Sequence, residues 1–155
     1  MQQDRDVTDA WADPPAAMSE FRSQLDVRLV DPQAHNHTGG WVLLAPLVYY
    51  STLLRREITV PVGFYTDFAS VPRRSVIAWG LFGGRGMRGA VVHDYLCRMH
   101  YLTKRERADK VFLEALLLDK VPAVKARAMY AAVAAYTATG LWKTEVDQPG
   151  FEPIG

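Results

Sequence analysis

Residues 58–73 read ITVPVGFYTDFASVPR, and the fold class depends on this stretch. Its first half places apolar side chains at every second position, at Ile58, Val60, Val62 and Phe64. That period is typical of a β-strand with one buried face. In the second half Pro72 closely follows Ser70, which favours the opening of a helix. The chain therefore passes here from strands to helices.

Two segments upstream also have the pattern of strands. Residues 24–29 alternate in the same way, and residues 41–51 are rich in β-branched and aromatic side chains. We predict that these segments and residues 58–64 form one small antiparallel sheet of about three strands. Pro46 and Pro61 have no N–H to donate, so each should lie at an edge, a bulge or a strand end. In the first strand the buried face would consist of Leu25, Val27 and Leu29.

Helical patterns occupy the rest of the chain. We predict about four helices packed on the sheet, over residues 72–81, over 87–100, from 103 onward and over 122–139. Thr103 and Glu106 have the spacing of a capping box, and Gly140 should end the last helix. Strands first and helices after them indicate an α+β fold.

The composition is that of one globular domain. The 155 residues are 49% hydrophobic and 23% charged, so a single core can support the fold without a structural metal. We place this domain at residues 20–143. A flexible N-terminal arm, residues 1–19, precedes it, and an irregular C-terminal tail, residues 144–155, follows it.

Charge and cysteine content exclude several classes. A formal net charge of +1 makes nucleic acid an unexpected partner. The single cysteine, Cys97, permits neither an intramolecular disulfide nor a multi-cysteine zinc site, and we interpret it as a small core residue.

The N-terminus lacks the apolar core of a signal peptide, and residues 128–142 are too few for a membrane span of roughly 20 residues.

Polar residues gather at two places in the expected fold. Asp67 lies at the junction of strand and helix, with Thr66 and Ser70 as neighbouring oxygen donors. The triplet His93-Asp94-Tyr95 lies within a helix among apolar residues, where an imidazole and a carboxylate need partners.

A third carboxylate, Asp109, falls in the register of the buried face of the next helix. If Asp67, either His93 or Asp94, and Asp109 converge, they would form a site for one divalent metal ion or for general acid–base catalysis, with His93 the favoured member of that pair. Asp94, Thr66, Ser70 and Tyr95 would support it. The alternative is a buried polar network that joins helix to sheet, with Asp67 or Ser70 serving only as a helix cap.

Arginines provide a different candidate site. Glycines at 84, 86 and 89 free backbone amides near a helix start, so Arg85 and Arg88, together with Arg73, could bind a small anion. A second basic group surrounds the start of the following helix and is diluted by acids, which is typical of a solvated face. It consists of Lys104, Arg105, Arg107 and Lys110.

Four motifs in this order resemble the domain of unknown function 1353 family, which occurs in tailed bacteriophages and prophages. They are residues 60–73, 90–96, 107–112 and 129–133, and the resemblance covers roughly residues 25–142. It implies a phage or prophage origin and synthesis in the cytoplasm of a bacterial host. It also draws attention to Asp67, Ser70, His93, Asp94 and Asp109, and it implies no particular activity.

Three functions remain open. The first is a virion-associated tail or baseplate accessory protein that binds other virion proteins through its arm and tail. The second is a metal-dependent hydrolase acting on host cell-wall peptides through Asp67, His93 and Asp109. The third is a binder of a small anionic ligand through Arg73, Arg85 and Arg88. The sequence leaves the oligomeric state open.

Overall fold

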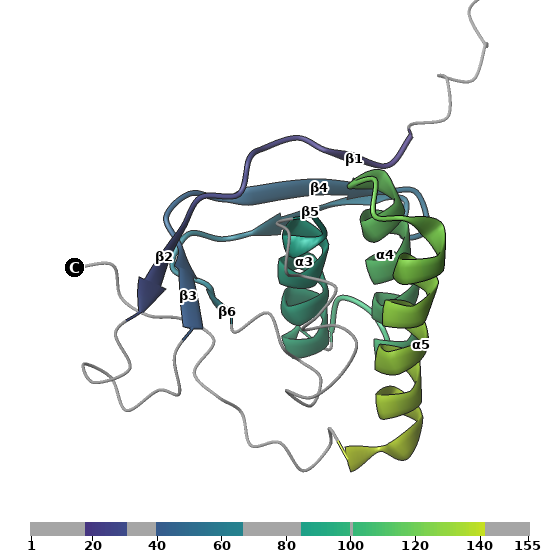
Figure 1. The fold of residues 1–155 in the computed structure, drawn as a ribbon. Helices are drawn as coiled ribbons and strands as arrows, with labels where there is room; N and C mark the ends of the chain where they lie inside the picture. The colour runs from purple at the N-terminus through teal and green to yellow at the C-terminus, as the bar shows by residue number, and fades with distance from the viewer. Residues whose placement is uncertain (1–17, 31–39, 67–84, 100, 142–155) are drawn as a thin grey trace, which may run out of the picture.

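The computed structural model describes residues 18–30, 40–66, 85–99 and 101–141. Within these ranges the chain forms six strands and then three helices, which confirms the predicted α+β order (Figure 1). The helix expected at residues 72–81 lies outside the described residues. Among the residues described, no helix has both the length and the apolar character that a membrane span requires.

The strands form two antiparallel sheets of three strands each, whereas one sheet was expected. The first sheet has the order β1 (Glu20–Phe21), β4 (Leu47–Ser51), β5 (Arg56–Val60). The second has the order β2 (Val27–Val30), β3 (Gly40–Leu43), β6 (Tyr65–Thr66). The predicted segment 41–51 is therefore divided between the two sheets. The predicted segment 58–64 contributes residues 58–60 to β5 of the first sheet, and β6 of the second sheet begins directly after the segment.

Two prolines account for this division. Pro46 interrupts residues 41–51, so β3 ends before it and β4 begins directly after it. Pro61 follows the last residue of β5, and Gly63 then adopts a positive φ of 83° before β6 begins. Both prolines lie at strand ends, as their missing N–H groups predicted.

The second sheet differs from expectation in one further respect. Leu29 was placed on the buried face, but it is 60% exposed, and Val30 is buried instead. Val30 joins Val42 and Tyr65 in a small apolar cluster of this sheet. Gly40 permits this packing, because a Cβ there would lie 2.3 Å from the hydroxyl oxygen of Tyr65.

Three helices complete the described fold. They are α3 (Met87–Arg98), α4 (Arg105–Leu118) and α5 (Ala123–Thr139). Figure 1 shows the β4–β5 hairpin across the ends of α3 and α4, with α5 on the outer side of α4. The main core lies between this hairpin and the helices. Its largest fully buried side chains include Tyr49 and Leu47 of the sheet, Leu96 of α3, Phe112 of α4 and Met129 of α5.

The helix ends test two predictions. Gly140 ends α5 in the left-handed conformation, with φ of 70°, as predicted. The predicted capping box at α4 is wrong, because Lys104 rather than Thr103 occupies the N-cap position and makes no side-chain capping bond. The N-cap residue therefore contributes no side-chain hydrogen bond to the amides of the first turn of α4.

Glu114 of α4 ties the helix to the start of the domain and to the β4–β5 turn. Its Oε1 accepts hydrogen bonds from the hydroxyls of Ser19 (2.5 Å) and Tyr49 (2.7 Å) and from the Thr52 amide (3.2 Å). Its Oε2 accepts one from the Leu53 amide at 3.2 Å. Ser19, expected in the arm, is thus anchored to the domain.

Replacing Glu114 with Gln removes the charge that strengthens these bonds and turns one acceptor into a donor. We expect Glu114→Gln to lower the free energy of unfolding by about 2 kcal/mol, measured by urea denaturation. The control is Glu106→Gln at an exposed position of the same helix, which should cost at most about 1 kcal/mol. Equal losses in the two variants would contradict this role for Glu114.

Tyr49 generates a prediction for alkaline solution. Burial, reinforced by the Glu114 carboxylate, raises the pKa of Tyr49 well above its ordinary value of 10.0. The folded state therefore holds this proton more tightly than the unfolded state, so the free energy of unfolding should fall as the pH rises above about 10. Tyr49→Phe should show a weaker decline over that range, and parallel curves for the two proteins would exclude the effect.

Candidate functional site

Helices α3 and α4 meet at close range and in opposite directions. A Cβ on Gly89 of α3 would lie 3.2 Å from the Cβ of Ala115 of α4, and one turn further along α3 His93 reaches Asp109. The absence of a side chain at Gly89 lets the helices approach. Both polar residues are buried, with 3% and 1% of their surfaces exposed.

His93 and Asp109 form a buried ion pair. The Nε2 of His93 lies 2.7 Å from Oδ1 of Asp109. Burial by itself lowers the pKa of His93, but the nearby Cys97 sulfur and the hydrogen bond with Asp109 outweigh it and raise the pKa to about 10. At neutral pH the imidazolium therefore donates to the carboxylate.

Cys97 belongs to this contact, although the sequence suggested only a core residue. It is one helical turn beyond His93, and its Sγ lies 3.4 Å from Nε2 of the imidazole. The Nε2, Sγ and carboxylate oxygen of His93, Cys97 and Asp109 all lie within 4.8 Å of one another. The signal for this site was the spacing of four residues, which puts a histidine and a cysteine on one helix face.

The geometry differs from that of a nucleophile–base relay. In such a relay the nucleophile contacts one ring nitrogen and the orienting carboxylate contacts the other. Here Cys97 and Asp109 both contact Nε2. The three side chains instead converge on one point, which is how the ligands of a metal ion are arranged.

Asp109 has a further oxygen that the pair does not use. Among the described residues, its Oδ2 is a buried side-chain oxygen without a hydrogen-bond partner. Such an atom is costly in a protein interior unless a water, an ion or another polar group faces it. The carboxylate therefore has unused capacity for a ligand.

Asp94 and Tyr95 point away from this centre. The hydroxyl of Thr66 in β6 donates to Oδ2 of Asp94 at 2.5 Å, and Asp94 is 1% exposed. The ring of Tyr95 packs edge-on against Phe64 with centroids 5.4 Å apart, and burial raises the pKa of its hydroxyl. These residues join α3 to the strands, while His93 joins it to α4.

Three predicted site residues, Asp67, Ser70 and Arg73, lie outside the described residues. Asp67 follows Thr66 directly in the sequence. The predicted convergence of His93 and Asp109 is present in the geometry, and the contribution of Asp67 stays a prediction.

The other predicted anion ligands line one cavity of about 460 Å³. Arg88 is already engaged there, because it contacts Asp119 at 2.5 Å and stacks on Phe21 with 4.1 Å to the ring centroid. Arg85 donates to the carbonyl of Lys120 at 3.5 Å. The cavity brings the two arginines together, but Asp119 neutralises much of its charge.

Comparison with family models identifies the family. The model described as Protein of unknown function (DUF1353) matches residues 41–133, and the chain belongs to this family. The matched region includes all three residues of the His93, Cys97 and Asp109 centre. No curated protein and no solved structure matches the chain.

The Thr66–Asp94 bond is open to a direct test. Thr66→Val keeps the shape of the side chain but removes the donor, which leaves a buried carboxylate oxygen with less compensation. We expect a loss of about 1–3 kcal/mol in the free energy of unfolding, measured by chemical denaturation. The exposed Thr59 of β5 offers the matched change, and Thr59→Val should be nearly neutral. A neutral Thr66→Val would show that the bond contributes nothing to stability.

Proposed function

We propose that the protein binds one divalent metal ion of the zinc class through His93, Cys97 and Asp109. The observation that carries this proposal is the convergence of an imidazole nitrogen, a thiol sulfur and a carboxylate oxygen within 4.8 Å in a buried place. Zinc takes these three ligand types at about 2.0–2.3 Å. A thiolate ligand favours zinc over magnesium or calcium, which prefer oxygen.

The contacts within the centre fit this assignment. Two ligands of one tetrahedral zinc ion lie about 3.3 Å apart, so the 2.7 Å contact between His93 and Asp109 would open slightly as the ion replaced the shared proton. The 3.4 Å separation of Cys97 and His93 is already close to that spacing. The unpartnered Oδ2 of Asp109 gives the carboxylate a second oxygen for the ion or its bound water.

We further propose that the metal serves hydrolysis, with host cell-wall peptides as the substrate class. The support is the ligand count, because catalytic zinc sites use three protein ligands and keep one position for a water whose pKa the metal lowers to about 7. Asp67 is the candidate for a base near that water, or for a fourth ligand in a closed, structural site. Asp67→Ala separates the two cases: metal retained with activity lost favours catalysis, and metal lost favours a structural centre.

The broader setting that we propose is a phage- or prophage-encoded protein, on the strength of the motif resemblance. A non-catalytic virion accessory role is the second candidate. Its support is the anchoring of Ser19 to Glu114 at 2.5 Å, which fixes the point where an N-terminal arm would leave the domain toward a partner. In that case the metal would stabilise the domain without turnover.

The first test is metal content by mass spectrometry on protein purified without an affinity tag. We expect about one zinc per chain, and a melting temperature that falls by roughly 5 °C or more when a chelator removes it. Protein without metal, whose melting temperature is indifferent to added zinc and to chelator, would refute the centre.

Variants assign the ligands. Cys97→Ser and Asp109→Asn should each lose the metal, whereas Asp94→Asn, a carboxylate on the same helix that faces Thr66, should retain it. Thermal melts accompany each measurement to show that the variant is folded. If wild type holds no metal and Asp109→Asn and His93→Ala lose equal stability, the centre is a structural polar network.

A further inference from the structure

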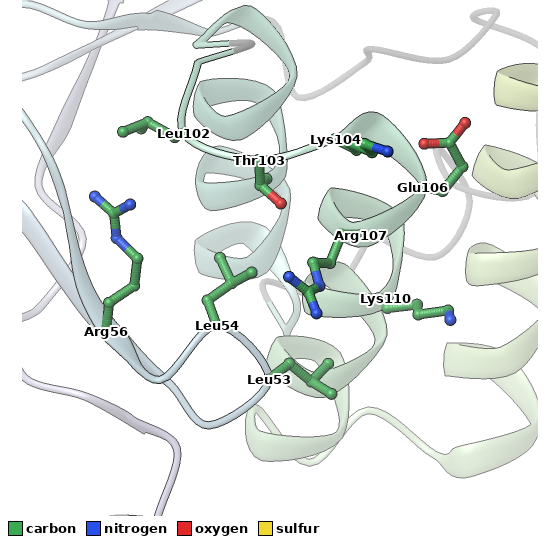
Figure 2. A pocket seen from close by; sticks show the side chains of 9 residues that line it. All are labelled: Leu53, Leu54, Arg56, Leu102, Thr103, Lys104, Glu106, Arg107 and Lys110. Carbon is green, nitrogen blue, oxygen red and sulfur yellow. The ribbon is translucent and has the colours of Figure 1, made fainter.

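A surface hollow of about 740 Å³ lies between the β4–β5 turn and the start of α4. The turn contributes leucines to one side of it, and the α3–α4 connection and the first turns of α4 form the other side (Figure 2). Its volume falls within the range of small-molecule sites, about 300–1,000 Å³. It is separate from the buried centre, because its α4 residues lie on the exposed face of that helix.

The hollow is lined by four cations and one acid, Glu106. The cations are Arg56, Lys104, Arg107 and Lys110. Within the described part of the chain, none of these four side chains forms an ion pair or a hydrogen bond, unlike Arg22 and Arg88, which pair with carboxylates. Three of the four basic residues predicted as a solvated face, Lys104, Arg107 and Lys110, thus surround a concavity together with Arg56 from another element. The fourth, Arg105, is instead 8% exposed and donates to the Thr137 hydroxyl of α5 at 3.3 Å.

The arrangement of donors suits a phosphate group. In the view of Figure 2 the Thr103 hydroxyl is directed toward Arg107, and Arg56 lies on the other side of Leu54. Guanidinium groups match phosphate oxygens in pairs of hydrogen bonds. The α4 N-terminus, whose N-cap residue Lys104 makes no side-chain capping bond, adds partial positive charge on the same side.

The remaining lining is apolar. Leu53, Leu54 and Leu102 contribute to the hollow, and Leu53 is 47% exposed. An inorganic anion would use only the basic side, whereas an anion with an apolar body would also cover these leucines.

We propose that this hollow binds a phosphomonoester whose phosphate contacts Arg56, Lys104 and Arg107 and whose apolar body covers the leucines. Several unpaired cations favour a dianion over a singly charged carboxylate. The inference does not rest on the metal centre, and its test is carried out in the presence of a chelator.

The test is isothermal titration calorimetry on the full chain, with phenyl phosphate, inorganic phosphate and phenol as probes. We expect phenyl phosphate to bind at least about tenfold more tightly than either of the others, since only it engages both sides of the hollow. Arg107→Gln and Arg56→Gln should each weaken phenyl phosphate at least about tenfold. The control Arg127→Gln removes the same charge from an exposed position of α5 and should leave affinity unchanged.

The source of the phosphate is distinguished by sedimentation with phosphatidic acid vesicles. Vesicle binding that Arg107→Gln abolishes assigns the ester to a lipid headgroup, and phenyl phosphate binding without vesicle binding assigns it to a soluble metabolite. The proposal is overturned by the absence of phenyl phosphate binding or by equal losses in Arg107→Gln and Arg127→Gln. Tighter binding of a single-stranded oligonucleotide with a steep salt dependence would also overturn it, in favour of a polyanion surface.

Discussion

Burial of α3 is the constraint on which the described structure depends. The helix is enclosed by the β4–β5 hairpin and by α4, yet its middle carries two adjacent polar residues, His93 and Asp94, each at most 3% exposed. Neighbours on a helix point about 100° apart, so the two residues need partners from different elements. Thr66 of β6 supplies one partner and Asp109 of α4 the other, and the polar pairs thereby fix α3 relative to strand and helix.

Local sequence patterns predicted the class of fold and the ends of several elements. They did not predict features of the structure that depend on which distant segments pair with one another. Pro46 and Pro61 were correctly placed at strand ends because the missing N–H is a property of the residue itself. The segments before and after each proline join different sheets. Their assignment depends on which distant strand pairs with each segment, and the alternation of apolar residues along one strand does not specify that partner. The exposure of Leu29 and the unused capping box at Thr103 follow similarly from tertiary context.

The candidate site was predictable to the extent that it follows helix register. The register of α4 placed Asp109 on a buried face, and the pattern of α3 placed His93 among apolar residues. Each side chain therefore required a polar partner, and the two form a hydrogen bond with one another. Cys97 was underestimated because a lone cysteine usually packs as a small apolar residue, and only the contact between its Sγ and Nε2 of His93 shows that it belongs to the polar centre. Asp94 lies next to His93 in the sequence, but it bonds to Thr66 of β6, whereas His93 bonds to Asp109 of α4. The sequence of the triplet alone does not show that the two residues have different partners.

Gly89 carries no functional group, yet it sets the dimensions of the centre. A methyl group there would meet Ala115 at 3.2 Å, and the helices would have to separate by a few tenths of an ångström to admit it. Such a shift is small for packing but large for coordination, where ligand distances are held to about 0.2 Å. In the metal site that we propose, the helix separation set at Gly89 would therefore influence which ion radius fits, although Gly89 is one helical turn away from His93.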